Sequence, residues 1–281
     1  MTDQYAVLGN PVTHSRSPFI HACFARQQHQ RMEYRAIEAP LDGFESCVSQ
    51  FLQGDGKGVN VTVPFKEQAW RLAACRTPRA ELAGAVNTLW RDESGQLWGD
   101  NTDGIGLVTD LTQNVQVKLE GARILMLGAG GAVRGVIQPL LDAGCSQLFI
   151  ANRTAEKAQL LVEQFAPLLP EGVLLQGGGY TSVPSDGEFD LIINGTSASL
   201  SGDLPPVNPV IVGAHTLCYD MMYSARPTAF CQWAITHQAA RAVDGLGMLV
   251  EQAAEAFLCW RGVRPDTAPV ISLLRQSLAQ Q

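Results

Sequence analysis

The sequence lacks the cysteine and histidine patterns of disulfide-bonded and zinc-binding proteins. Its 281 residues include seven cysteines, an odd number, and no two of them form a CxxC pair. The five histidines show no spacing that is typical of metal ligands. We therefore expect neither a disulfide framework nor a bound metal, and a reducing cytoplasm is the compartment that suits free thiols.

Signals for a membrane or a nucleic acid are also missing. The N-terminal stretch MTDQYAVLGNPVTHS has no basic segment followed by an apolar run, and no apolar stretch reaches membrane-spanning length. The net charge is −7 and charges of both signs are dispersed, so no basic face is expected for DNA or RNA. A content of 46% hydrophobic and 17% charged residues is typical of a soluble globular protein. The sequence leaves the oligomeric state open, either a monomer or a homodimer.

Short apolar runs alternate with segments of helical periodicity, which is the pattern of an α/β protein. Strands are expected near residues 5–9, 32–37 and 59–63, and AVNTLWRDESGQLWGDN predicts a hairpin. A helix should begin at Ser17-Pro18, with Ser17 as its N-cap.

The middle of the chain repeats a strand, a turn and a helix. The segments ARILMLG, QLFIANRT, GVLLQ, FDLIING and HTLCYD have the βαβ rhythm of a mononucleotide-binding domain. After Val243 only helical periodicity follows, so the last helices should return to the first part of the chain. We therefore predict two α/β domains with a cleft between them. Residues 1–104 with 245–281 form a substrate domain with a parallel-rich sheet, and residues 105–244 form a Rossmann-like domain.

A glycine turn, Gly128-Ala129-Gly130-Gly131-Ala132, follows the apolar run that ends at Leu127. Glycines between a strand and a helix let a pyrophosphate approach the amides at the start of the helix. Val133 occupies the third glycine position of the GxGxxG motif, so the motif alone is also compatible with a tight structural turn. Its place between a predicted strand and a predicted helix favours a nucleotide site.

The end of the next predicted strand distinguishes NADP from NAD. NAD-specific domains usually carry an acidic residue there, whereas this chain has Asn152-Arg153-Thr154, followed by Lys157. A guanidinium, a hydroxyl and helix N-terminal amides suit a 2′-phosphate. The alternative is that Arg153 and Lys157 are solvated and Thr154 only caps a helix. The glycine turn upstream makes NADP the preferred cofactor.

Lys66 and Asp103 are the candidate acid–base pair. Lys66 directly follows the apolar segment GVNVTVPF, and the carboxyl ends of strands in α/β sheets are where ligands bind. Asp103 lies in GDNTDG at the start of a predicted helix, where it could also serve as a cap. If the two side chains meet, the carboxylate could orient the ammonium, which could exchange a proton with a carbonyl or hydroxyl oxygen.

Other small polar residues suit a hydroxylated carboxylic acid. Ser15 and Ser17 in HSRSPF place hydroxyls beside a helix N-terminus, which favours a carboxylate. The uncharged donors and acceptors suited to a polyol are Asn60, Thr62, Asn87 and Gln252. Each of them could instead satisfy backbone groups.

Eight motifs occur together in a characteristic order. They are NPVTHSRSPFIH, GVNVTVPFKE, LAGAVNT, GDNTDGIG, LGAGGA, NRT, CYDMMY and VDGLGMLVEQAA. In this set the chain resembles the shikimate dehydrogenase family from Tyr5 almost to its C-terminus.

The resemblance implies the NADPH-dependent, reversible reduction of 3-dehydroshikimate to shikimate, a step towards the aromatic amino acids. It implies that Lys66 and Asp103 form the catalytic pair and that Ser15 and Ser17 hold the substrate carboxylate. The ring hydroxyls would contact Thr62, Asn87, Asp103, Gln252 and Tyr223. Cofactor contacts would come from Gly128 to Ala132, Asn152 to Thr154, Lys157, Thr196, Met221 and Gly245.

Two alternatives remain open. A quinate/shikimate dehydrogenase that uses NAD would favour an acidic residue at the position of Asn152-Arg153-Thr154. A non-catalytic, NADP-sensing module could bind the nucleotide without a proton donor, but the presence of Lys66 and Asp103 disfavours it.

Overall fold

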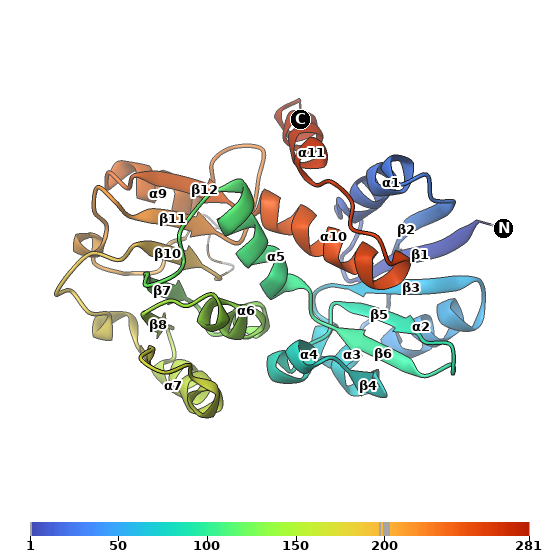
Figure 1. The fold of residues 1–281 in the computed structure, drawn as a ribbon, viewed down its shortest axis with the longest axis horizontal. Helices are drawn as coiled ribbons and strands as arrows, with labels where there is room; N and C mark the ends of the chain where they lie inside the picture. The colour runs from blue at the N-terminus through green and yellow to red at the C-terminus, as the bar shows by residue number, and fades with distance from the viewer. Residues whose placement is uncertain (1, 197, 199–202, 281) are drawn as a thin grey trace. The chain divides into compact units, whose positions relative to one another are not determined.

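The structure, a computed structural model, describes residues 2–196, 198 and 203–280, which form two compact units (Figure 1). Unit 1 consists of the residues up to Gly106 together with Leu249–Leu274. Unit 2 consists of Leu107–Met248 together with the residues from Arg275 onward.

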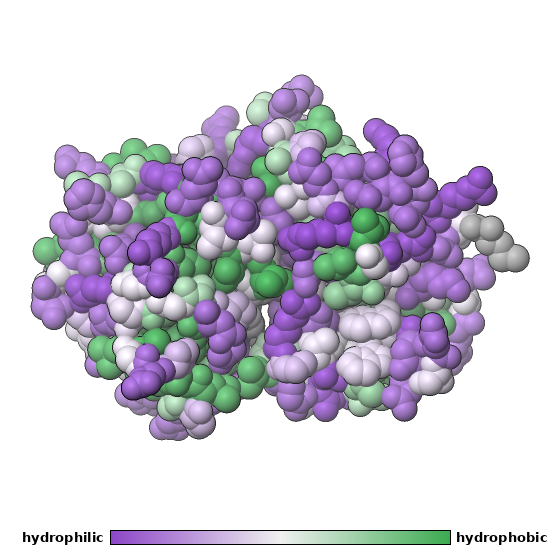
Figure 2. Space-filling view, viewed as in Figure 1, coloured by the Kyte–Doolittle hydropathy of each residue, from purple (hydrophilic) through white to green (hydrophobic). Residues whose placement is uncertain are grey.

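Among the described residues, no helix combines the length and apolar character that crossing a bilayer requires. On the face drawn in Figure 2, polar residues predominate and apolar residues are interspersed among them.

Unit 1 contains a mixed six-stranded sheet. β1 pairs in parallel with β2 and β3, β4 pairs in parallel with β6, and β5 runs antiparallel to β3 and β6. The antiparallel part is the predicted hairpin, whose turn is held by Asp92 accepting from the amides of Ser94 and Gln96. The strands are β1 (Asp3–Gly9), β2 (Met32–Glu38), β3 (Gly56–Val61), β4 (Cys75–Arg76), β5 (Thr88–Arg91) and β6 (Leu97–Asp100), in the order β2-β1-β3-β5-β6-β4.

Apolar side chains from helices and strands form the core of unit 1. Leu8, Val59 and Phe65 are buried in one cluster with Phe44, and the Phe44 and Phe65 rings stack at 4.7 Å. This packing fixes the start of α3 against the end of β3. The helices with residues in unit 1 are α1 (Ser17–Gln27), α2 (Phe44–Gln53), α3 (Lys66–Leu72), α4 (Pro78–Ala83), α5 (Asp103–Thr109), α10 (Leu246–Arg261) and α11 (Ala268–Ala279).

The start of α1 differs from the sequence prediction. Arg16 is the N-cap, Ser17 is the first helical residue, and no side chain makes a capping hydrogen bond. Pro18 still lies in the first turn, where its missing N–H leaves no helical bond unmade. Ser17 therefore does not use its hydroxyl as a helix cap.

Unit 2 contains a fully parallel six-stranded sheet, which confirms the Rossmann-like fold. Its central strands are continuous apolar runs because a parallel sheet is covered on both faces. β12 was not predicted from the sequence. The strands are β7 (Arg123–Leu127), β8 (Gln147–Ala151), β9 (Leu174–Gly178), β10 (Leu191–Asn194), β11 (Leu217–Asp220) and β12 (Arg241–Asp244), in the order β12-β11-β10-β7-β8-β9.

The helices of unit 2 connect these parallel strands. α6 (Gly131–Asp142) follows β7, α7 (Ala155–Phe165) follows β8, and α9 (Ala229–Thr236) precedes β12. β7 lies between β8 and β10, so the chain reverses its direction across the sheet at β7. In α/β sheets, ligands bind at the carboxyl ends of the strands beside such a reversal.

Candidate functional site

Lys66 and Asp103, which are 37 positions apart in the sequence, meet in unit 1. Each is the first residue of its helix, Lys66 of α3 and Asp103 of α5. The Lys66 Nζ donates to Asp103 Oδ2 at 2.6 Å, and the side chains are 24% and 10% exposed. The pair is thus shielded enough for its charges to interact strongly while the ammonium remains reachable.

Asn87 holds the other oxygen of the carboxylate. Its Nδ2 donates to Asp103 Oδ1 at 2.8 Å, and its Oδ1 accepts from the backbone N–H of Thr102 at 3.0 Å. Gln252 Oε1 lies 3.4 Å from the same Nδ2. Four of the residues predicted to act on the substrate therefore lie together: Lys66, Asn87, Asp103 and Gln252.

Of the remaining substrate candidates of unit 1, Ser15 and Ser17 lie at the start of α1, and Asn60 and Thr62 lie at the end of β3. Ser15 Oγ accepts from the N–H of Ser17, and Ser17 is 8% exposed. Thr62 directly follows β3 and is half-buried. Asn60 is different, because its amide is already engaged by Tyr34, by Thr88 and by a backbone carbonyl.

The predicted cofactor residues line one edge of the unit 2 sheet. The parallel strands β7, β8, β11 and β12 each end directly before one of them, and β10 ends two positions before Thr196. The carboxyl ends of these parallel strands lie on the same edge of the sheet. In sheet order the residues are Gly245 after β12, Met221 after β11, Thr196 after β10, the glycine turn after β7, and Asn152 to Thr154 after β8.

The glycine turn has the form that a pyrophosphate needs. Gly128 has a φ of +110°, a conformation that side-chain-bearing residues rarely adopt. A Cβ added at Gly130 or Gly131 would meet no atom within 4 Å, and no side chain caps α6. The first amides of this 12-residue helix are therefore open to an anion, which fits a dinucleotide.

Gly195 explains how Val133 can occupy the third glycine position of the motif. A Cβ added at Gly195, in the turn after β10, would lie 2.4 Å from Val133 Cγ2. The close contact that normally requires a small residue on the helix is achieved here by glycine on the neighbouring turn. The departure from GxGxxG therefore leaves the amides predicted to bind the pyrophosphate unaffected.

The turn after β8 presents cations to solvent. Arg153, Thr154 and Lys157 are exposed, and Thr154 makes no side-chain capping hydrogen bond. Asn152 Nδ2 donates to the backbone oxygen of Thr154 at 2.9 Å, which shapes the turn. A guanidinium, a hydroxyl and an ammonium are thus available on one short segment, and this set fits a 2′-phosphate.

Contacts also fix the turns after β10 and β11. The Thr196 N–H and hydroxyl both donate to Asn194 Oδ1, at 3.1 and 2.7 Å. A Cβ at Gly245 would lie 2.4 Å from the backbone oxygen of Met221, so only glycine fits there. Tyr223 lies two residues beyond Met221 and is half-buried in unit 2.

Comparison with known proteins identifies the family. Three family models match successive parts of the chain: the shikimate dehydrogenase substrate binding domain at residues 7–89, shikimate / quinate 5-dehydrogenase at 110–176, and the shikimate 5′-dehydrogenase C-terminal domain at 245–275. A shikimate dehydrogenase (NADP(+)) from Hahella chejuensis is 57% identical over 98% of this chain and 99% of its own length. The chain belongs to the shikimate dehydrogenase family. A relative of the same description from Marinobacter nauticus is 56% identical over 97% of this chain and 98% of its own length.

Solved structures agree with membership of the shikimate dehydrogenase family. An Ael1 enzyme from Pseudomonas putida matches with a TM-score of 0.91 and 46% identity, covering 97% of this chain and 98% of that one. Shikimate 5-dehydrogenase from Thermus thermophilus, in complex with NADP(H) and shikimate, matches with a TM-score of 0.84 and 30% identity over 99% of this chain and all of that one.

In this family member, some residues beside the site were not found from the sequence. Tyr34, Thr88 and Thr102 hydrogen-bond to Asn60 or Asn87, and Asp220 hydrogen-bonds to Asn194 beneath the cofactor edge. Thr102 stands in the GDNTDG motif and could have been identified there. Tyr34 and Thr88 belong to ordinary strand segments, and no local pattern distinguishes them.

Proposed function

We propose that the protein catalyses the reversible, NADPH-dependent reduction of 3-dehydroshikimate to shikimate. The observation that carries the proposal is the Lys66–Asp103 pair, held at 2.6 Å and hydrogen-bonded further to Asn87. The names of the relatives, shikimate dehydrogenase (NADP(+)), support the same substrate and cofactor.

In this proposal Lys66 handles the proton. NADPH, when bound, would supply the hydride that adds to the carbonyl carbon of the substrate. Lys66 donates a proton to the carbonyl oxygen, and in the oxidative direction it accepts the hydroxyl proton. Asp103 aims the ammonium and compensates its charge, while Asn87 prevents the carboxylate from rotating.

The other polar residues bind and orient the two ligands. Ser15 and Ser17 hold the substrate carboxylate, and Thr62, Gln252 and Tyr223 contact the ring hydroxyls. We assign the pyrophosphate to the amides of Gly128 to Ala132 and the 2′-phosphate to the Asn152–Thr154 turn with Lys157. Thr196, Met221 and Gly245 border the rest of the cofactor.

The cellular setting follows from the thiols. All seven cysteines are free, and we propose a cytoplasmic enzyme on that basis. The proposal applies equally to a monomer and a homodimer.

An absorbance assay tests the function. Purified protein mixed with shikimate and NADP should generate the nicotinamide absorbance of NADPH, and 3-dehydroshikimate with NADPH should abolish it. Parallel reactions with NAD and with quinate measure the two specificities. Faster turnover with NAD than with NADP would contradict the cofactor assignment, and nucleotide binding without any turnover would favour a sensing module.

A further inference from the structure

A chain of hydrogen bonds leads from an outer strand of unit 1 to the catalytic carboxylate. The Tyr34 hydroxyl on β2 donates to Asn60 Oδ1 at 2.7 Å, and Asn60 Nδ2 donates to Thr88 Oγ1 at 3.1 Å. Thr88 Oγ1 donates to Asn87 Oδ1 at 2.9 Å, and Asn87 Nδ2 donates to Asp103 Oδ1 at 2.8 Å.

The pairing of the strands creates the middle of this chain. Asn60 on β3 and Thr88 on β5 are directly opposite each other in the antiparallel register. Side chains of such a pair lie on the same face of the sheet, close enough to bond. Asn60 is 6% exposed and Thr88 is fully buried, so water does not replace these bonds readily.

The donors and acceptors can be arranged in only one direction. The Asn60 NH₂ group donates to the backbone oxygen of Asn87 as well as to Thr88, so its Oδ1 faces Tyr34 and accepts from the phenol. The Thr88 oxygen then accepts from Asn60, and its hydrogen is directed to Asn87. Asn87 must therefore present its NH₂ group to Asp103, an orientation that the Thr102 N–H also favours.

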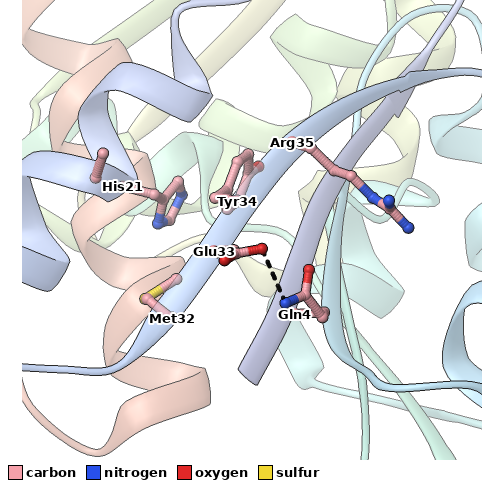
Figure 3. Close-up of a pocket in the computed structure, with 7 residues that line it drawn as sticks. Gln4, His21, Met32, Glu33, Tyr34 and Arg35 are labelled. Carbon is pink, nitrogen blue, oxygen red and sulfur yellow. Dashed lines mark hydrogen bonds between the residues drawn. The ribbon is translucent and has the colours of Figure 1, made fainter. Parts of the chain in front are cut away.

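Packing keeps the Tyr34 phenol in place. The His21 ring stacks on Tyr34 with centroids 4.2 Å apart and planes 7° apart. Burial raises the pKa of Tyr34 well above its usual range, with the Ser17 hydroxyl opposing this only partly, so the phenol keeps its proton. Figure 3 shows both rings beside a cavity of about 360 Å³ at β2. The His21 ring nitrogens are buried, so a molecule in the cavity would not reach them. The imidazole therefore serves as a packing surface for Tyr34.

We propose that Tyr34, Asn60 and Thr88 are positioning residues that fix the orientation of Asn87 and, through it, the carboxylate of Asp103. This role takes the place of a direct substrate contact for Asn60. The inference rests on the proposed dehydrogenase function, because it concerns how the Lys66–Asp103 pair is held.

Thr88 allows a matched pair of variants. Thr88→Val keeps the shape and removes the hydroxyl, whereas Thr88→Ser keeps the hydroxyl and removes a methyl group. Thr88→Val loses both buried hydrogen bonds of the hydroxyl, to Asn60 and to Asn87, and is expected to lower kcat for shikimate oxidation about tenfold. Thr88→Ser should stay within about twofold of the wild type, and the KM for NADP should be unchanged in both.

Tyr34→Phe interrupts the same chain at its other end. It should also lower kcat, and combining it with Thr88→Val should lower kcat no further than the larger single effect, because both changes break one network. Tyr5→Phe is the control: the Tyr5 hydroxyl accepts from Arg261 at 3.3 Å in the same unit, away from Asn87, and this variant should keep wild-type kcat.

Two kinetic outcomes would overturn the proposal: a Thr88→Val kcat within twofold of the wild type, or effects of Tyr34→Phe and Thr88→Val that multiply. A second readout does not depend on activity. Hydrogen exchange of the Asn87 side-chain NH₂ group, assigned by its loss in Asn87→Asp, should be faster in Thr88→Val than in the wild type. Unchanged exchange of this NH₂ group would refute the positioning role of the hydrogen-bond chain, whereas an inactive wild type would refute only the proposed function.

Discussion

At the scale of the residue, Lys66 is the group whose removal should separate rate from binding. Lys66→Ala should lower kcat by about two to four orders of magnitude, because a positioned proton-transfer group typically contributes that much. The KM for shikimate should change only modestly, and steady-state kinetics in both directions measures the split. Lys57→Ala, which removes an exposed lysine from β3 of the same unit, should have neither effect. Equal losses in kcat and in shikimate binding would instead mean that Lys66 mainly positions the ring.

Arg153 should determine the preference for NADP. Arg153→Ala should raise the KM for NADP about 10- to 100-fold, since a hydrogen bond to a charged group contributes about 1.5–3 kcal/mol. The KM values for NAD and shikimate should change little. Lys118→Ala, which removes another exposed cation of unit 2, serves as the control for net charge. A KM for NADP unaffected by Arg153→Ala would mean that the 2′-phosphate binds elsewhere.

His21 makes a residue-level prediction about acid stability. Burial lowers the pKa of His21 from 6.5 to about 3, and the Asn60 side chain opposes this only partly. Below pH 6.5 the His21 imidazole is protonated in the unfolded chain but stays neutral in the folded chain. The contribution of the neutral His21 ring to the free energy of unfolding is therefore complete above pH 6.5. It is lost as the pH falls towards 3, by up to about 1.4 kcal/mol per pH unit.

Urea unfolding of the wild type and His21→Phe at pH 7, 6, 5 and 4 measures this contribution. Carboxylates titrate alike in both proteins, so the difference between their free energies of unfolding isolates His21. The wild type should lose more stability than the variant as the pH falls from 6.5. Parallel losses in the two proteins would contradict the burial of a neutral imidazole.

The sequence predicted those site residues whose chemistry has a local signature. Lys66 directly after an apolar strand and Asp103 at the start of a helix could be proposed from position and residue type, although spacing alone did not show that they meet. Tyr34 and Thr88 could not be found, because their roles depend on strand register. Asn60 and Thr88 become neighbours only when β3 pairs with β5.

At the scale of the element, the start of α10 packs against η1, the π-helical turn Asp110–Asn114 that follows α5. A Cβ added at Gly247 would lie 1.9 Å from Asp110 Oδ1, and Tyr219 donates to Asp110 Oδ2 at 2.6 Å. The carboxylate is thus confined between a helix backbone and a buried phenol, all within unit 2.

Gly247→Ala should consequently destabilise the protein by about 1–3 kcal/mol through overpacking. The sign is informative, because alanine in an unconstrained helix would stabilise by up to about 1 kcal/mol relative to glycine. Urea unfolding measures the change. Gly131→Ala is the control for stability, since a Cβ there meets no atom within 4 Å. A Gly247→Ala variant as stable as the wild type would show that Asp110 moves aside.

Burial decided which elements the sequence could predict. β7, β10 and β11 are buried apolar runs and were recognised, because a strand covered on both faces has a continuous hydrophobic pattern. β12 is a half-exposed edge strand, and β4 has only two residues, so neither produces such a run. Their existence depends on pairing with a neighbour that is already in place.

At the scale of the whole molecule, we propose that the two units correspond to the domains predicted as residues 1–104 with 245–281 and as residues 105–244. They differ from this prediction in that residues 105–106 group with unit 1, and residues 245–248 and those from Arg275 onward group with unit 2. Each unit has its own sheet and core. The candidate substrate residues lie in unit 1 with the exception of Tyr223, and the candidate cofactor residues lie in unit 2. The residues from Arg275 onward group with unit 2, where Arg275 Nη1 donates to Asp244 Oδ2 at 2.8 Å. Each ligand should therefore stabilise its own domain.

Hydrogen exchange detected by mass spectrometry measures the protection of the backbone amides in each of the two domains separately. A ligand at about 100 times its Kd stabilises the folded state that binds it by about 2.7 kcal/mol, which slows exchange through unfolding about 100-fold. NADP should therefore slow exchange in the strands of unit 2, most of all around residues 128–134 and 152–157. Shikimate should slow exchange in unit 1, around residues 15–20 and 60–66. With Arg153→Ala, the same NADP concentration should protect unit 2 less while shikimate still protects unit 1 fully. Equal protection of both units by NADP alone would show that they unfold together, because a ligand bound to one cooperative block stabilises every part of it alike.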